Sequence, residues 1–222
     1  MKLLKYQHWH FLSLLVLLTG IYVYVANNDS LLKGDLLVIK TTTWFLLAIL
    51  SPIFHQIYVL LFWRLELFYN SISKIFGANG FKVYKIGFAI LFLSRLLTII
   101  FLAISSANTL DINPIFAYTI GGLFFIPSVY LFYSVKKYFG IDRAFGIDHF
   151  HPEKFKNEAF VRKGIFKYTS NGMYIFGFFI LWIPGLLLLS KAALLVAAFN
   201  HIYIWVHYYF TELPDIRVIY ED

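Results

Sequence analysis

Long stretches of apolar residues, separated by shorter polar ones, dominate the pattern along this chain. A helix that crosses a bilayer needs about 20 mostly apolar residues, because the hydrocarbon core is roughly 30 Å thick and each residue adds about 1.5 Å. Six segments meet this requirement, at about residues 9–26, 36–63, 83–104, 115–138, 173–189 and 192–210. The pattern therefore predicts an all-α polytopic membrane protein of about six transmembrane helices, forming one integral-membrane domain over residues 1–222.

Two prolines and one short connection refine this prediction. Pro52 and Pro127 lie inside the second and fourth spans, where proline removes a backbone hydrogen bond and kinks a helix. Only Ser190 and Lys191 separate the last two spans, which must therefore form an antiparallel helical hairpin. The first span follows a short basic arm, as a signal peptide would, but no clear small-residue cleavage site follows it, which favours a retained helix.

The composition agrees with a chain whose surface faces lipid. Of the 222 residues, 60% are hydrophobic, 21% aromatic and 14% charged, and the mean hydropathy is +0.71. Typical soluble domains are roughly 45–50% apolar and about 25% charged, so too few polar residues remain here to cover a water-facing surface. A disordered chain, a nucleic-acid-binding domain and a soluble enzyme are thus excluded. Without cysteine there is no disulfide, thiolate metal site or cysteine nucleophile.

Membrane topology, rather than a nucleic-acid partner, explains the net charge of +7. Fifteen lysines and arginines lie on the side that holds both termini and the loops after the second and fourth spans, and three lie on the other side. Because cytoplasmic loops carry the excess of Lys and Arg, we expect both termini and the loop at residues 139–171 to face the cytoplasm, in a bacterial inner membrane or its equivalent. Anionic headgroups are natural neighbours of such loops.

Most of the polar character lies in the cytoplasmic loop and around the sixth span. The loop is longer than a connection requires, and long loops often carry function. Its Asp-His-Phe-His-Pro stretch at residues 148–152 contains metal-ligand types, but no third ligand follows at a recognised spacing, so we expect no metal site.

The sixth span carries polar groups on an apolar helix. Because residues three or four apart share a helix face, we predict one stripe and an adjoining one. The first contains His201, Trp205, Tyr208 and Glu212, and the second Asn200, Ile204, His207 and Thr211. Polar groups at membrane depth face a cavity or the bundle interior, or they bond to neighbouring helices.

Arg95 lies near the middle of the third span, and no carboxylate occupies that depth in the other spans. Two interpretations stay open. Arg95 donates to backbone carbonyls near Pro52 or Pro127, or it contacts an anionic group of a ligand, which makes it a candidate substrate-binding residue.

The C-terminal third carries a series of motifs in a recognisable order. The run Gly-Ile-Phe-Lys-Tyr-Thr-Ser-Asn-Gly-Met-Tyr at residues 164–174 leads into the hairpin, and Thr-Glu-Leu-Pro-Asp at residues 211–215 and Tyr220 follow it. This resembles the integral-membrane methyltransferase superfamily, which includes isoprenylcysteine carboxyl methyltransferases and phospholipid N-methyltransferases. The pair Asn171-Gly172 stands where many members have His-Pro or Asn-Pro, so no histidine role is carried over to this position.

The resemblance implies that residues 139–222 form a methyltransferase-like region that binds S-adenosylmethionine at the cytoplasmic ends of the last spans, without a Rossmann domain. The implied cofactor-binding residues are Asn171 and Tyr174 in the turn, Tyr168 and Trp205 as aromatic walls, His201 on the hairpin, and Glu212. Glu212 and His201 are also the candidate catalytic bases. A cationic sulfonium favours a carboxylate and aromatic faces, and its methionine part needs polar partners, for which Arg162 or Lys163 are further candidates.

By resemblance, the acceptor is lipid-borne and the partners are membrane lipids; the amine headgroup of a phospholipid such as phosphatidylethanolamine is the first choice. Three alternatives stay open, and the oligomeric state is not predicted. One is an isoprenylcysteine-type carboxyl methyltransferase, and another is a non-catalytic transport or substrate-capture subunit in which Arg95 holds an anionic solute. The third is a b-type haem protein with ligands such as His55 and His201.

Overall fold

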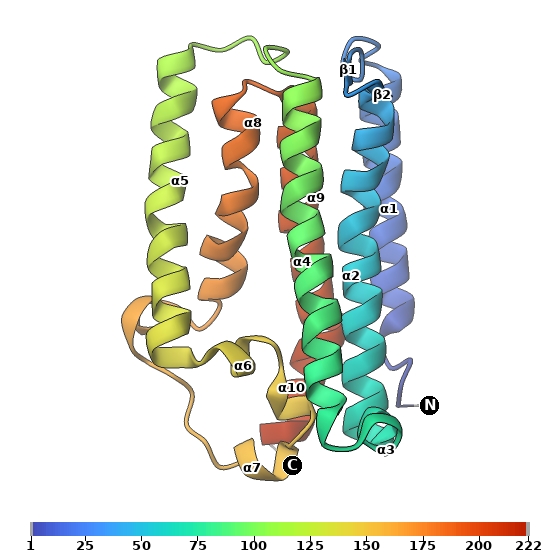
Figure 1. Ribbon diagram of the computed structural model, residues 1–222, viewed down its shortest axis with the longest axis vertical. Coiled ribbons are helices and arrows are strands. Elements are labelled where there is room, and N and C mark those ends of the chain that lie inside the picture. The colour runs from blue at the N-terminus through green and yellow to red at the C-terminus, as the bar shows by residue number, and fades with distance from the viewer. Residues whose placement is uncertain (1, 221–222) are drawn as a thin grey trace.

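The computed structural model describes residues 2–220, and most of this part of the chain is helical (Figure 1). The longer helices are α1 (Gln7–Ala26), α2 (Thr41–Tyr69), α4 (Gly80–Ser105), α5 (Pro114–Ser134) and α9 (Lys191–His207). The shorter ones are α3 (Ser71–Phe76), α6 (Ile141–Ala144), α7 (Pro152–Phe155), α8 (Ile183–Leu187) and α10 (Leu213–Tyr220). Strands β1 (Asp35–Leu36) and β2 (Ile39–Lys40) pair antiparallel, with Asp35 opposite Lys40.

Short 3₁₀ and π turns connect or extend these helices. The 3₁₀ turns are η1 (Gly77–Asn79), η3 (Ile147–His149), η4 (Gly164–Lys167) and η6 (Phe178–Leu181). The π turns are η2 (Val135–Phe139), η5 (Met173–Gly177) and η7 (Tyr208–Glu212). Two of the three π turns, η5 and η7, lie in the C-terminal hairpin region, where they displace side chains from the positions that a regular α-helix would give them.

Four helical segments of the described chain are long and apolar enough to cross a membrane, and they match the first four predicted spans. They are Gln7–Ala26, Thr41–Tyr69, Ser71–Ser105 and Pro114–Phe139. The predicted count of six is not confirmed. The fifth predicted span is a shorter apolar segment, Met173–Leu187, built from π, 3₁₀ and α turns in succession, and the sixth is regular α-helix only to His207. The antiparallel hairpin itself is present, because α8 packs against α9 across the short turn.

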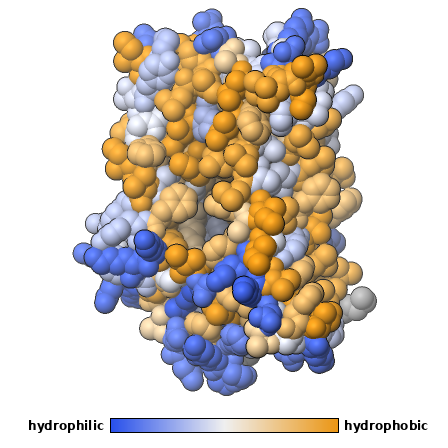
Figure 2. All heavy atoms as spheres, viewed as in Figure 1, coloured by the Kyte–Doolittle hydropathy of each residue, from blue (hydrophilic) through white to orange (hydrophobic). Residues whose placement is uncertain are grey.

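Both ends of the described chain lie at the same end of the bundle, together with α3, α6, α7 and α10, whereas β1, β2 and the turn between α8 and α9 lie at the other (Figure 1). Figure 2 shows hydrophilic residues at the two ends of a broad apolar belt, with the larger group at the end that holds the termini. The predicted arrangement, with both termini and the basic loops on one side, therefore agrees with the fold.

Helix α9 is the centre of the bundle, with contacts to α1, α2, α4 and α8. Its small residues Ala192, Ala193, Val196 and Ala197 are fully buried. Small side chains let helix backbones approach closely in membrane proteins, where association depends on packing and polar contacts rather than on the hydrophobic effect. Pro52 and Pro127 lie within α2 and α5, and neither ends its helix.

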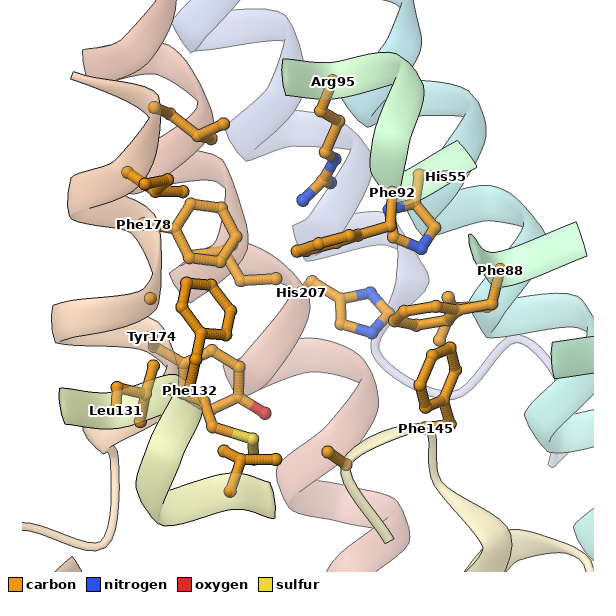
Figure 3. A pocket seen from close by; sticks show the side chains of 18 of the residues that line it. His55, Phe88, Phe92, Arg95, Leu131, Phe132, Phe145, Tyr174, Phe178 and His207 are labelled. Atoms are coloured by element: carbon orange, nitrogen blue, oxygen red, sulfur yellow. The ribbon is translucent and has the colours of Figure 1, made fainter. Parts of the chain in front are cut away.

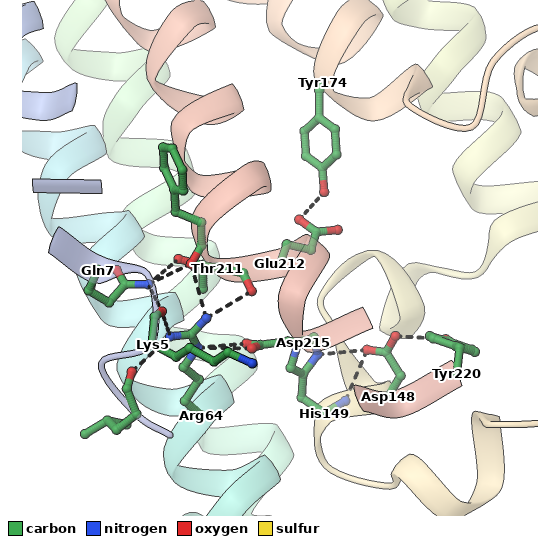
Figure 4. A network of polar contacts seen from close by, with 12 residues as sticks. Lys5, Gln7, Arg64, Asp148, His149, Tyr174, Thr211, Glu212, Asp215 and Tyr220 are labelled. Carbon is green, nitrogen blue, oxygen red and sulfur yellow. Dashed lines mark hydrogen bonds and ion pairs between the residues drawn. The ribbon is translucent and has the colours of Figure 1, made fainter. Parts of the chain in front are cut away.

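One buried arginine joins α2 to three other segments at the end that holds the termini (Figure 4). Arg64 is 1% exposed, and its Nε donates to both carboxylate oxygens of Asp215 in α10, at 3.0 and 3.2 Å. The two terminal nitrogens donate to four backbone carbonyls, those of Leu3, Lys5, Phe210 and Thr211. All five N–H donors of the guanidinium thus have acceptors.

We predict that Asp215→Ala lowers the free energy of unfolding by about 3 to 5 kcal/mol, because it leaves a buried guanidinium without its counter-ion. The matched control is Lys85→Gln, which removes the exposed ion pair between Lys85 and Asp142 and should cost less than about 1 kcal/mol. Denaturant unfolding in detergent micelles measures both values. Equal losses in the two variants would contradict the prediction.

Candidate active site

A cavity of about 580 Å³ lies between α2, α4, α5 and the C-terminal hairpin, within the usual size range of small-molecule sites (Figure 3). Most of its wall is aliphatic or aromatic. The polar residues that line it are His55, Gln56, Arg95, Lys136, Tyr174, His207 and Glu212. They come from α2, α4, η2, η5, α9 and η7, so the cavity draws on both halves of the chain.

The cavity opens on the side of the bundle, between α4 and α5. Phe92 of α4 and Phe132 of α5 line it and are still 41% and 43% exposed. Figure 2 shows a hollow at this place, bordered above by apolar side chains and below by the hydrophilic residues at the end that holds the termini. The opening therefore lies at the edge of the apolar belt.

Glu212 enters the cavity because α9 continues as a π turn. In a π turn the hydrogen bonds join residues five apart, so Glu212 lies on the face of His207 rather than on that of Tyr208. Glu212, His207 and Ile204 line the cavity, whereas His201 and Trp205 do not. The predicted stripe of His201, Trp205, Tyr208 and Glu212 is therefore wrong beyond His207, because it assumed regular α-helical spacing.

Tyr174 and Glu212 form the polar end of the cavity (Figure 4). The hydroxyl of Tyr174 in η5 donates to the Glu212 carboxylate, and the Tyr174 ring packs against Trp205 and Tyr208. Burial raises the pKa of the Glu212 carboxyl to about 7, although the hydrogen bond from Tyr174 acts to lower it. Sequence analysis assigned both residues to one site, and the structure brings them into direct contact.

Several other polar atoms at the cavity have no hydrogen-bond partner in the described chain. They are both ring nitrogens of His55, Oε1 of Gln56, Nε1 of Trp63, Nε of Arg95 and Nδ1 of His207. Buried polar groups in proteins are almost always paired, with protein or with water, so a group of unpartnered ones around one cavity indicates a place for a polar ligand or for ordered water. Arg95 donates one hydrogen bond, to the carbonyl of Pro52 at 3.2 Å, which is one of the two kinds of contact left open for it by the sequence.

The remaining predicted cofactor residues lie outside this cavity. Tyr168 is 76% exposed, and Asn171 contributes its carbonyl to the start of η5, as acceptor for the backbone N–H of Tyr174 at 3.1 Å. His201 faces the other helical arm of the hairpin, where its Nδ1 accepts a hydrogen bond from Nε1 of Trp182 at 3.1 Å. These residues border the elements that carry Tyr174 and Glu212 rather than the cavity itself.

Sequence reasoning gave no role in the site to Gln56, Trp63 or the aromatic wall that α4 provides, and it placed His207 only beside the main stripe. The available signal was the His55-Gln56 pair inside an otherwise apolar span, since polar residues at membrane depth usually face a cavity. Trp63 and Phe88 gave no such signal, because aromatic residues are common throughout this chain.

A second polar cluster supports the cavity from the end that holds the termini (Figure 4). His149 stacks on Trp63 with 4.0 Å between ring centroids, and its Nδ1 lies 3.0 Å from a carboxylate oxygen of Asp148, whose other oxygen accepts from Tyr220. Burial acts to lower the pKa of His149, but the carboxylates of Asp148 and Asp215 outweigh it and raise the pKa overall. Within residues 2–220 no group of three or more His, Asp or Glu side chains is arranged to hold a metal ion.

Comparison with known proteins bears on the C-terminal half of the chain. Residues 116–222 match the family model described as phospholipid methyltransferase. No curated protein and no solved structure matches the chain. The matched range contains most of α5, the hairpin, Tyr174, His207 and Glu212, and therefore one wall and the polar end of the cavity. Over residues 116–222 the chain thus carries the sequence pattern of the phospholipid methyltransferases, which confirms its resemblance to the integral-membrane methyltransferase superfamily.

Proposed function

We propose that the protein is an S-adenosylmethionine-dependent methyltransferase that acts on a lipid-borne acceptor, with the amine headgroup of a phospholipid such as phosphatidylethanolamine as the first candidate. The family match supports methyltransferase chemistry in a membrane protein. The observation that carries the proposal is the cavity, in which Glu212 and Tyr174 face a space lined by aromatic rings and open between α4 and α5.

The residues at the polar end of the cavity suit the cofactor. A sulfonium centre is cationic and is stabilised by a carboxylate and by aromatic faces, and Glu212, Tyr174 and Phe178 provide both kinds of group in one cavity. The unpartnered nitrogens of His55 and His207 offer hydrogen bonds to the polar parts of a ligand. When bound, the cofactor supplies a methyl group that its positive sulfur activates for displacement.

The chain itself contributes positioning, exclusion of water and a proton acceptor. An apolar cavity that holds donor and acceptor in line lowers the barrier mainly by orientation and desolvation. An ammonium acceptor must lose a proton before it attacks, and a carboxyl with a pKa of about 7 is well matched to accept that proton near neutral pH. We assign this role to Glu212, because His201 does not line the cavity.

The topology fits an acceptor drawn from one leaflet. The opening lies at the edge of the apolar belt nearest the end that holds the termini, which carries most of the lysines and arginines. By the charge bias, this end faces the cytoplasm. A lipid headgroup of the cytoplasmic leaflet is then at the level of Glu212.

The first test is binding of S-adenosylhomocysteine to the purified protein in detergent and in nanodiscs, followed by transfer of labelled methyl groups to phosphatidylethanolamine and to a prenylcysteine. Saturable binding and labelled phospholipid are the expected results. Label on the prenylcysteine alone would show that the acceptor is a prenylcysteine rather than a phospholipid, and methyl transfer would remain the reaction. Folded protein that binds no S-adenosylhomocysteine in either environment would overturn the proposal.

We predict that Glu212→Gln weakens binding of sinefungin at least tenfold and changes the affinity for S-adenosylhomocysteine much less. Sinefungin carries an ammonium group near the position of the sulfonium, whereas the sulfur of S-adenosylhomocysteine is neutral, so only the former loses a charge-assisted contact, worth about 1.5–3 kcal/mol. Calorimetry measures both affinities. The control is Glu158→Gln, which removes an exposed carboxylate that pairs with Arg143. Equal effects on the two ligands would contradict a cation contact at Glu212.

The affinity for sinefungin should also depend on pH. Glu212 is charged above a pH of about 7 and neutral below it, so the affinity should fall as the pH falls through this value, while that for S-adenosylhomocysteine stays nearly constant. Tyr174→Phe removes a donor that stabilises the charged form, so the midpoint should move to higher pH. Titrations at a series of pH values measure both midpoints; an unchanged midpoint in Tyr174→Phe would show that the two side chains are not coupled.

A further inference from the structure

Arg95 differs from the other deeply buried arginine in its surroundings. Arg64 uses all five N–H donors on Asp215 and four carbonyls. Arg95 is 3% exposed, donates one hydrogen bond, to the carbonyl of Pro52, and within residues 2–220 it forms no ion pair. Since a buried guanidinium without a counter-ion is costly, the protein alone does not account for this residue.

Unpartnered nitrogens of Arg95, His55 and His207 belong to the lining of the same cavity. Figure 3 shows the guanidinium directed from α4 into the cavity, with His55 and His207 below it and the ring of Phe92 between the guanidinium and His207 in this view. The two histidines are 4% and 3% exposed, and three of their four ring nitrogens lie buried without a partner. The guanidinium also packs over the ring of Phe178, 5.7 Å from its centroid, which limits its orientation. A buried cation and two imidazoles therefore line one cavity, and within residues 2–220 no carboxylate forms an ion pair with that cation.

We infer that Arg95, His55 and His207 form a subsite for an anionic oxygen group, a phosphate or a carboxylate, of the ligand whose cationic group lies at Glu212. The planar fork of a guanidinium matches both oxyanions, and a neutral imidazole adds one N–H donor. Glu212 and Arg95 line the same cavity, and Figure 3 shows Tyr174, the partner of Glu212, on the opposite wall below Arg95. The cavity thus offers an anionic and a cationic contact to one zwitterionic occupant.

Two ligands of the proposed reaction carry this chemistry. The methionine part of the cofactor ends in a carboxylate, and a phospholipid headgroup contains a phosphate next to its amine. The inference rests on the proposed function for the identity of these ligands, but direct binding tests it without turnover.

The experiment compares Arg95→Gln with the wild-type protein and with Arg217→Gln, which removes an arginine exposed on α10 outside the cavity. Calorimetry gives the affinity for S-adenosylhomocysteine. Native mass spectrometry gives the affinity for phosphatidylethanolamine relative to diacylglycerol with the same acyl chains. We expect Arg95→Gln to lower the affinity for one of the two ligands at least tenfold, and Arg217→Gln to lower the affinity for neither.

The outcomes separate the two sources. Loss of S-adenosylhomocysteine alone assigns the subsite to the cofactor carboxylate, and loss of the preference for phosphatidylethanolamine alone assigns it to the lipid phosphate. Unchanged affinities for both would overturn the inference and leave Arg95 as a structural contact of Pro52. A wild-type protein that binds these ligands without transferring a methyl group would contradict the proposed function and leave the subsite unaffected. A wild-type protein that binds neither ligand would overturn both the proposed function and the subsite.

A second variant keeps the test valid if Arg95→Gln does not fold. His55→Phe replaces a ring whose two nitrogens have no partner, so a merely structural role predicts equal or higher thermal stability and unchanged binding. A subsite predicts that the variant folds and loses affinity for the ligand identified above. The control is His8→Phe, at an exposed position on α1. Retained affinity in a folded His55→Phe protein would exclude this histidine from the subsite and count against the inference.

Discussion

The guanidinium of Arg64 fixes the position of the carboxylate on which the proposed chemistry depends. It donates to the carbonyls of Phe210 and Thr211, inside the π turn that ends at Glu212, and to Asp215, three residues further on. A π turn is uncommon because its hydrogen bonds are less favourable than those of an α-helix, so external partners help to hold it. Those partners are Arg64 of α2 and Gln7 at the start of α1, whose Nε2 donates to the Phe210 carbonyl at 2.8 Å, so the first half of the chain holds this turn of the C-terminal half.

The fold was predictable to the extent that it follows from solvation. In lipid every backbone polar group must be paired within the segment, so long apolar stretches have to be helices, and residues 9–26, 36–63, 83–104 and 115–138 correspond to helices in the structure. The hairpin followed from the two-residue connection. The mixed π, 3₁₀ and α turns of residues 173–187 were not predictable, because hydrophobicity reports burial in lipid and not the way in which each turn is hydrogen-bonded.

The candidate site was predictable in its motifs and not in its geometry. Glu212 and Tyr174 were identified by resemblance, and Arg95 because a charge stands out in an apolar span. Glu212 lies on the same face as His207 because the π turn inserts one extra residue, which the residue pattern does not predict. Trp63, Gln56 and Phe88 come from the first half of the chain, and only tertiary packing shows that α2 and α4 supply about a third of the lining residues.

The side opening between Phe92 and Phe132 has a kinetic consequence. A molecule that enters there travels in the plane of the bilayer and keeps its acyl chains in lipid throughout, so the quantity that governs encounter is its mole fraction among the surrounding lipids and not its amount per volume of solution. Diluting the acceptor with inert lipid at constant total acceptor would then slow the reaction, whereas adding more vesicles of the same composition would not. Saturation would be described by a two-dimensional Michaelis constant.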